Sequence, residues 1–211
     1  AYIAAVSDDG VAAADEPFGP GSPFVCKSHW PTYDPDKARA LLEDYAAPVA
    51  VTFGHTATPR GQAAGQIFQQ FWQAVGIEVT LEPLEQVQLV TNVFRRRFQV
   101  GPWRLRDSQD PDPDLYGLFY STSPFNVTGL TDDALDQLLL DARRTGERSE
   151  RQAHYCALER YLAEQVPYLY LGENTYFAIA RADLPGEVSL RGGLLSVRGI
   201  HAPMAGVNNP P

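Results

Sequence analysis

Val49–Leu81 reads VAVTFGHTATPRGQAAGQIFQQFWQAVGIEVTL, and this stretch decides the fold. Its first five residues are rich in β-branched and aromatic side chains, and its last five alternate between apolar and polar, so each predicts a strand. Between them, after Pro59, apolar residues recur at helical spacing until Gly76, a residue type that commonly ends a helix. The apolar residues are Ala63, Ile67, Phe68, Phe71, Trp72 and Val75. The stretch therefore predicts two parallel strands joined by a right-handed helical crossover.

A helix is also predicted immediately before this stretch. Asp34 is a good N-cap, and Pro35 suits the first helical position because the backbone N–H that it lacks would be unpaired there. The apolar residues that follow fall on one face, which we expect to be buried. They are Ala38, Leu41, Leu42 and Tyr45.

Further elements are predicted after the crossover. One helix is expected over 84–97. Another is capped by Thr131, and its inward residues are Leu135, Leu138, Leu139 and Ala142. A third opens with a capping box of Ser149 and Gln152 and stops at Pro167. Short runs at 168–171 and 176–180 are typical of strands.

The distribution of turn-forming residues sets the expected segment boundaries. Glycine, proline and aspartate crowd residues 7–33, which predicts an irregular lead-in over 1–33, cut from a longer chain. An α/β lobe is expected over 34–185, with a βαβ-containing mixed sheet flanked by helices. Residues 186–211 are expected to be an irregular C-terminal segment.

Composition excludes several classes of protein. The 211 residues are 44% hydrophobic, enough for a proper core. Lys+Arg 17 against Asp+Glu 26 gives a net charge of -9, which argues against nucleic acid as a partner. The run Arg95–Arg97 is interpreted as a solvated strip, with a phosphate-binding patch as the alternative. The sequence contains no apolar run of transmembrane length and no signal-peptide pattern.

Two cysteines, Cys26 and Cys156, leave two possibilities open. They form one disulfide if the protein is exported. Alternatively, Cys156 is a small buried apolar residue of a helix and Cys26 is incidental.

The stretch Phe98–Thr128 is the candidate ligand wall. It begins as a short apolar run and continues into a loop that contains Trp103, four aspartates and two prolines. Proline stiffens a loop and aspartate accepts turn hydrogen bonds, and binding residues are often placed on loops held by a rigid scaffold. The remainder of the chain is interpreted as that scaffold.

No catalytic or metal-binding motif is found in the sequence. The histidines are scattered, and CxxC, a phosphate loop and GxSxG are absent. Asp110, Asp112 and Asp114 alternate like the start of a calcium loop, but Leu115 stands where glycine is needed and Ser121 where glutamate is needed. We therefore predict a protein that is not an enzyme and that carries no metal and no cofactor.

Five motifs in order resemble one known family. They are Tyr33–Leu42, Val75–Val79, Trp103 followed by Asp107 and Asp110-Pro111, Asn126 ahead of Leu135–Arg143, and Glu150–Tyr155 leading to Val166–Leu169. Together they are similar to the C-terminal half of the extracellular solute-binding proteins of family 5, which serve peptide-type ABC importers.

The resemblance implies a periplasmic-binding-protein-like lobe. Members of the family close two lobes on a solute outside the membrane, so this chain would supply one wall and the missing N-terminal lobe the other. The implied ligand is a peptide or similar small solute, and the implied partners are the membrane subunits of the importer. The implied location is extracytoplasmic, with a lipid tether on the full-length parent.

The resemblance also suggests ligand-binding residues. In peptide-binding relatives an aspartate pairs with the α-amine of the ligand, and counting back from Asp110-Pro111 gives Asp107, with Trp103 as an apolar face beside it. Many relatives carry this acid three residues after the tryptophan, where this chain has Arg106. Either the loop contains an insertion, or Arg106 takes the position and prefers an acidic ligand. Arg104 and Arg106 could also neutralise Asp107 internally. Asn126 is the fourth expected contact.

Two functions follow from these expectations. The first is delivery of a peptide to an importer by closure of two lobes. The alternative is a lipoprotein of the same fold that regulates envelope assembly through protein contacts, because one scaffold can host many functions.

Overall fold

The computed structural model describes residues 2–3, 11–14, 16–18, 22–26, 30–105, 110–174, 179, 181, 186–191 and 194–199. The chain divides into two compact units, Ala1–Asn174 and Thr175–Pro211.

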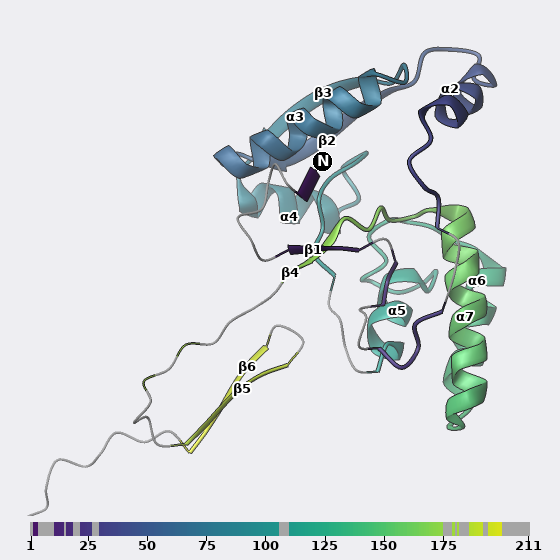
Figure 1. Cartoon of the computed structure of the whole chain (residues 1–211), viewed down its shortest axis with the longest axis vertical. Helices are drawn as coiled ribbons and strands as arrows, with labels where there is room; N and C mark the ends of the chain where they lie inside the picture. Colours follow the sequence, from purple (N-terminus) through teal and green to yellow (C-terminus); the bar gives the residue numbers. More distant parts are fainter. Residues whose placement is uncertain are drawn as a thin grey trace, which may run out of the picture. The chain divides into compact units, whose positions relative to one another are not determined.

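The predicted crossover is confirmed in the first unit. Strands β2 (Ala50–Thr56) and β3 (Glu78–Leu84) are parallel and fully paired, and α3 (Pro59–Gln73) connects them (Figure 1). Gly76 follows the helix with φ 102°, a conformation that glycine adopts without strain. Phe53 of β2 stacks on Phe68 of α3, with ring centroids 5.1 Å apart. This contact places the apolar side of α3 on one face of the pair.

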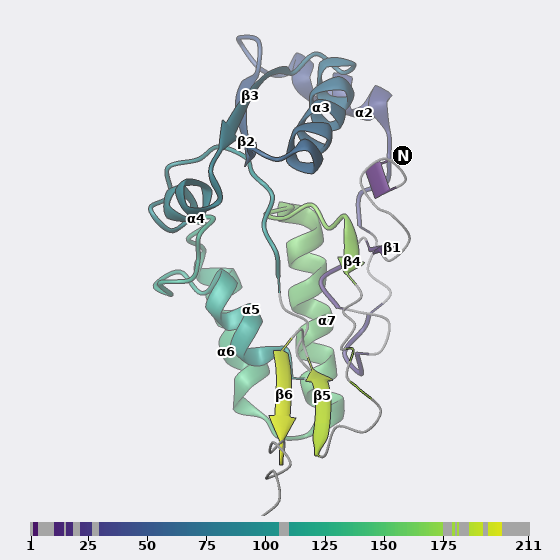
Figure 2. The same cartoon turned by 90° about the vertical axis from the view of Figure 1, so that its left-hand side faces the viewer.

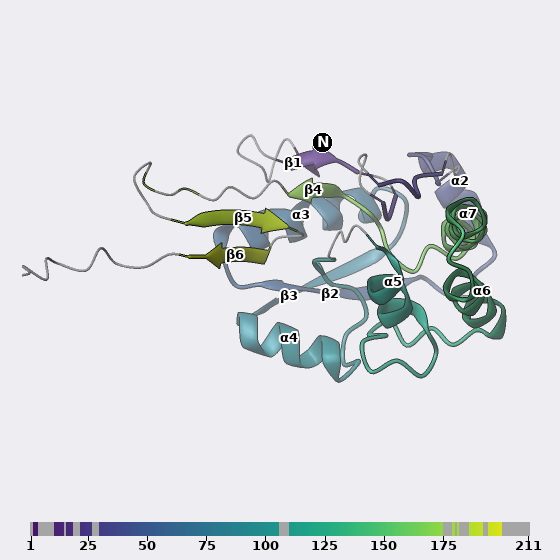
Figure 3. The same cartoon turned by 90° about the horizontal axis from the view of Figure 1, so that it is seen from below.

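The opposite face of the pair carries α4 (Gln86–Phe94), so the two strands lie between two helices (Figure 3). The strands of the described residues form three two-stranded pairs, one parallel and two antiparallel, rather than one continuous mixed sheet. The α/β class and the βαβ unit are confirmed.

The apolar face of α2 (Pro35–Glu43) was predicted wrongly. The helix starts as expected, because the Asp34 carboxylate accepts a hydrogen bond from Lys37 N at 2.9 Å. No residue of α2 is buried, however, and Leu41 is 58% exposed. Helical periodicity shows that a face is apolar but not how fully it is covered, and here Ala38 and Leu42 are only half-buried.

The main core lies between three helices, α5 (Asp112–Phe119), α6 (Asp133–Arg144) and α7 (Arg148–Gln165) (Figure 2). Its fully buried side chains include Phe119 of α5, Leu135 of α6, and Tyr155, Leu158 and Leu162 of α7. Helix α6 packs against both α5 and α7. These helices form the rigid part of the scaffold.

Helix α5 corrects the expectation of a loop after Asp110. Proline is tolerated in the first turn of a helix, where Pro113 stands, and the acidic Asp112 and Asp114 favour the positive end of the helix dipole. Leu115 and Phe119, one turn apart, are both buried. The same residue types that suggested a loop therefore start a helix.

Two predicted helix caps are also corrected. The N-cap of α6 is Asp132, one residue after Thr131, and its carboxylate accepts hydrogen bonds from Ala134 N at 2.8 Å and Leu135 N at 3.0 Å. Helix α7 starts at Arg148, so Ser149 and Gln152 already lie inside it and form no capping box.

The N-terminal segment is tied to the rest of the first unit by a strand pair and by a disulfide, and its Phe18 and Phe24 are buried in the main core. Strand β1 (Val11–Ala13) pairs antiparallel with β4 (Gly172–Asn174), and Cys26 forms a disulfide with Cys156 of α7. Of the two cysteine interpretations, the disulfide is the one found. The strand expected at 168–171 occurs slightly later, as β4, and most of 176–180 lies outside the described residues.

The second unit contains an antiparallel hairpin of β5 (Glu187–Arg191) and β6 (Leu194–Arg198), where an irregular segment was expected. Both runs alternate between apolar and polar residues, a pattern typical of strands.

Candidate functional site

The candidate wall begins where the chain leaves the sheet. Gly54 N donates a hydrogen bond to Val100 O at 2.9 Å, and Val100 N donates to Thr52 O at 3.3 Å. Val100 therefore pairs with the edge of β2 that β3 leaves free. Pro102 cannot continue this ladder because it has no N–H. The chain therefore departs from the sheet immediately before Trp103.

Trp103 packs against the end of α4. Its ring meets Phe94 edge-on, with centroids 5.7 Å apart, and it covers a small cluster of Leu89, Val93 and Val127. Phe94 is 50% exposed, and Trp103 is half-buried. The two rings thus present a partly open apolar surface at the end of α4.

A groove of about 360 Å³ lies next to this surface, between α4 and the adjacent face of β2–β3. Leu89 and Val93 of the Trp103 cluster line the groove, and so does Phe98, which packs against that cluster. The polar lining residues are Thr52, Asn92 and Gln99. Its charged residues are Glu82 and Arg97. Sequence reasoning missed this groove, because its lining comes from four separate segments.

Within the wall, Asp110 is held by an ion pair with α7. Arg151 of α7 donates to both carboxylate oxygens, Nη2 to Oδ1 at 2.6 Å and Nη1 to Oδ2 at 3.3 Å. Asp110 Oδ1 also accepts from Asp112 N at 3.1 Å. The hydrogen bond from Arg151 holds the pKa of Asp110 below its ordinary value, and Asp110 in turn raises the pKa of Arg151. Both groups are therefore charged at neutral pH.

Asp112 is held in a similar way. Arg143 Nε lies 3.0 Å from Asp112 Oδ1, and the Arg143 guanidinium lies 3.9 Å above the Tyr116 ring. Burial raises the pKa of Asp112, and the positive charge of Arg143 opposes this shift. Asp110 and Asp112 are therefore scaffold residues that face arginines, rather than the opening ligands of a calcium loop.

The side chain of Asn126 makes its hydrogen bonds within its own loop. The side chain is fully buried, and its amide donates to Leu130 O at 2.7 Å and to Tyr120 O at 3.3 Å. Its oxygen accepts from Thr128 Oγ1 at 2.9 Å and from Gly129 N at 3.1 Å. An asparagine side chain has two donors and two acceptor positions, and all four are used. The structure thus gives Asn126 a role in the fold, and its predicted ligand contact stays a prediction.

Two predicted ligand residues, Arg106 and Asp107, lie outside the described residues. The structure adds Arg143 and Arg151, which sequence reasoning missed. Each is a charged position on a predicted helix, and nothing in that pattern indicates a carboxylate partner in another segment, which for Arg151 lies 41 residues away.

Comparisons with known proteins agree on one group. The family described as bacterial extracellular solute-binding proteins, family 5 Middle, matches residues 1–126. Di/tripeptide-binding protein 2 of Pseudomonas aeruginosa is 29% identical over 168 residues, which cover 74% of this chain and 31% of that protein. The dipeptide-binding protein of Escherichia coli is 25% identical over 174 residues, with the same coverage of 74% and 31%.

Solved structures show the same fold. The periplasmic binding protein DppA from Helicobacter pylori, in complex with peptide STSA, is 25% identical with a TM-score of 0.71, covering 81% of this chain and 35% of that one. The dipeptide binding protein from Pseudoalteromonas sp. SM9913, in complex with Met-Leu, is 20% identical with a TM-score of 0.76, covering 92% and 40%. The chain therefore spans about a third of the length of these relatives. Among the described residues, no helix is long and apolar enough to cross a membrane.

Proposed function

Because this chain belongs to the bacterial extracellular solute-binding proteins of family 5, we propose that it is one lobe of a protein that captures a peptide for an ABC importer. The relatives named as dipeptide- and tripeptide-binding proteins support a peptide over the alternative of an envelope regulator. The lobe performs no chemistry in this proposal. The other wall of the cleft belongs to the remainder of the parent protein.

The observation that carries the proposal is the partly open Trp103–Phe94 surface at the point where the chain leaves the sheet. It offers an apolar face to a side chain of the ligand, and the adjacent groove offers polar groups. Ligand sites commonly combine a largely apolar surface with a few polar groups.

Asp107 is the proposed partner of the ligand's α-amine. A carboxylate that receives hydrogen bonds from an ammonium group makes a charge-assisted contact, which is stronger than a neutral one. Asp110 and Asp112 are already paired with arginines, so they are poorly suited to this role. If Arg106 occupies the position instead, the site prefers an acidic ligand.

The disulfide supports an extracytoplasmic location, because such bonds persist in oxidising compartments. A lipid tether on the parent protein is part of the same proposal.

The test uses the full-length parent. Native mass spectrometry of protein purified without denaturation should release a mass in the peptide range. Isothermal titration with Met-Leu and with N-acetyl-Met-Leu should then show tighter binding of the free amine. Asp107→Asn should weaken binding of Met-Leu by roughly 10- to 100-fold, as expected for the loss of a hydrogen bond to a charged group.

Glu43→Gln is the matched control, because it removes one negative charge from the exposed surface of α2. The affinity of the Glu43→Gln variant for Met-Leu should equal that of the parent. Absence of a bound peptide, together with no binding of either probe, would contradict the proposed function. Unchanged binding by Asp107→Asn would contradict the role of that residue alone.

A further inference from the structure

We propose that Arg96 is a positioning residue for Trp103, because it ties the end of α4 to the loop 126–130, which contributes Val127 to the cluster that Trp103 covers. This inference rests on the proposed function, since it concerns ligand affinity at the surface formed by Trp103 and Phe94. Arg96 itself does not touch the ligand in this proposal.

Arg96 takes a backbone conformation that favours glycine, with φ 52°. Its N–H donates to Val93 O at 2.9 Å, and Arg97 N donates to Asn92 O at 2.8 Å. These two hydrogen bonds form a Schellman motif at the end of α4, in which the left-handed position is usually a glycine. An arginine at this position strains the backbone, and such strain persists only where other contacts hold the residue. The contacts of the Arg96 side chain are suited to this role.

The side chain of Arg96 reaches the loop 126–130. Its Nη2 donates a hydrogen bond to Asn126 O at 2.9 Å. A Cβ on Gly129 would lie 3.5 Å from Arg96 Cδ and 3.8 Å from both Nε and Nη1, so the arginine lies across this glycine. A hydrogen bond from a charged guanidinium is stronger than a neutral one, and the planar group is rigid. The loop is therefore held to α4 by a directed hydrogen bond and by packing.

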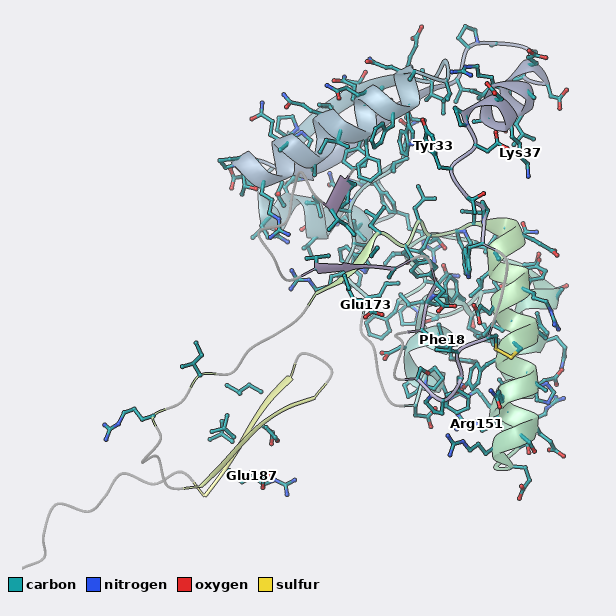
Figure 4. The ribbon with its side chains drawn as sticks, viewed as in Figure 1. Phe18, Tyr33, Lys37, Arg151, Glu173 and Glu187 are labelled. Carbon is teal, nitrogen blue, oxygen red and sulfur yellow. A yellow bond between two sulfur atoms is a disulfide. The ribbon has the colours of Figure 1, made fainter. Side chains whose placement is uncertain are left out.

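The loop 126–130 contacts two apolar clusters. Val127 is 4% exposed and belongs to the cluster that Trp103 covers. Leu130 packs against the main core, whose Phe18 is labelled in Figure 4. Because protein interiors are densely packed, a shift of Val127 away from α4 would open the first cluster and move the Trp103 ring.

The hydrogen bonds of the Asn126 side chain do not replace the link from Arg96. All of their partners lie between residues 120 and 130, so they fix the shape of the loop rather than its distance from α4. Arg96 is 30 residues away from Asn126 in sequence, and it bonds the loop from the side of α4.

The experiment compares Arg96→Gly, Arg96→Asn and Arg96→Lys in the full-length parent, each with and without Trp103→Ala. Glycine and asparagine both tolerate the left-handed backbone, so the first two variants remove the side-chain contacts and keep the end of α4. Arg95→Asn is the matched control, because it removes the same charge from the neighbouring exposed residue, whose φ is -89°. The affinity for Met-Leu is measured by isothermal titration, and the melting temperature is recorded for each variant.

We expect Arg96→Gly and Arg96→Asn each to lower the affinity for Met-Leu about fivefold, within the range for residues coupled through a backbone shift. In the Trp103→Ala background the same changes should alter affinity by no more than about twofold, because the ring that Arg96 positions is absent. Arg96→Lys should keep part of the affinity, since it retains the charge without the planar group. Arg95→Asn should bind Met-Leu as the parent does.

The melting temperature of Arg96→Gly should stay within about 2 °C of that of the parent, because glycine relieves the strained backbone as the hydrogen bond is lost. Arg96→Asn provides the same affinity test if Arg96→Gly folds poorly.

Equal losses of affinity with and without the Trp103 ring would mean that Arg96 supports only the general structure, and this would overturn the proposal. Unchanged affinity in Arg96→Gly and Arg96→Asn would overturn it as well. A parent that binds Met-Leu equally well after Trp103→Ala retains the proposed function and rejects the positioning role. No binding of Met-Leu by the parent also rejects this role, and the proposed function is then judged by the released peptide mass.

Discussion

Asn126 is a side chain whose hydrogen-bonding capacity is used entirely within one loop. Replacement by alanine would leave the carbonyls of Tyr120 and Leu130 and the N–H of Gly129 without this partner in a buried place. Buried groups that lose a partner cost about 1–3 kcal/mol each, so Asn126→Ala should destabilise the protein by about 2–4 kcal/mol. Chemical denaturation of the full-length parent measures this loss.

Asn92→Ala is the comparison for that variant. Asn92 makes a single exposed side-chain hydrogen bond, with Gln88 at 2.8 Å, so its loss should change stability by about 0.5 kcal/mol or less. Similar effects of the two variants would contradict the assigned role of Asn126.

The lowered pKa of Asp110 predicts how the stability of the protein depends on pH. Its pKa in the folded protein lies below the ordinary value of 3.8, with the hydrogen bond from Arg151 as the first cause. The stability that this carboxylate contributes is therefore present above pH 3.8 and is lost as the pH falls through the lowered pKa. Asp110→Asn should be slightly less stable than the parent at pH 7, by about 1 kcal/mol or less, because the pair is exposed.

The difference between Asp110→Asn and the parent should shrink below pH 3.8, when denaturation curves are compared across the acid range. A difference that grows with acid would mean that the sign assigned to the pKa shift is wrong.

Helix α3 packs closely on the sheet at Gly65, its buried glycine. A Cβ at this position would lie 3.0 Å from His55 Cδ2 and 3.3 Å from Leu81 Cδ2. Alanine is favoured over glycine inside a helix by about 1 kcal/mol, but overpacking costs about 1–3 kcal/mol. We therefore expect Gly65→Ala to destabilise by about 1 kcal/mol, measured as a lower urea midpoint.

Gln66→Ala, at the next and exposed position, tests helix propensity without the clash. It should be neutral or slightly stabilising. A stabilised Gly65→Ala would show that His55 and Leu81 move aside at little cost.

Local sequence patterns predicted the helices and strands better than they predicted what packs against them. The crossover around α3 was predictable because both its strands and its helix have a clear period. Helix α5 was missed because proline and aspartate are common both in loops and in the first turn of a helix. The burial of α2 was overestimated, since periodicity identifies an apolar face without identifying its cover. The Arg151–Asp110 pair could not be predicted, because its partners are brought together only by the packing of α5, α6 and α7.

The disulfide links distant parts of the chain, because its cysteines are separated by 130 positions in sequence. By the chain-entropy estimate, closing so long a loop in the unfolded state stabilises the folded state by about 5 kcal/mol, although measured gains are often smaller. Replacing both cysteines with serine should therefore lower the melting temperature of the parent markedly. Dithiothreitol should lower the melting temperature of the parent in the same way and leave that of the double variant unchanged.

An equal melting temperature for the parent and the double variant would show that the link adds nothing to stability.

The same link has a consequence for biogenesis. Cys26 is synthesised before Cys156, which follows only after both strands of the crossover and helices α2 to α6. Since this chain contains two cysteines, it offers the oxidising machinery a single intramolecular product. Within this chain, errors of oxidation can only join separate molecules. When this chain is oxidised by itself, formation of the disulfide should thus depend on dilution and on an oxidase, and it should not require an isomerase.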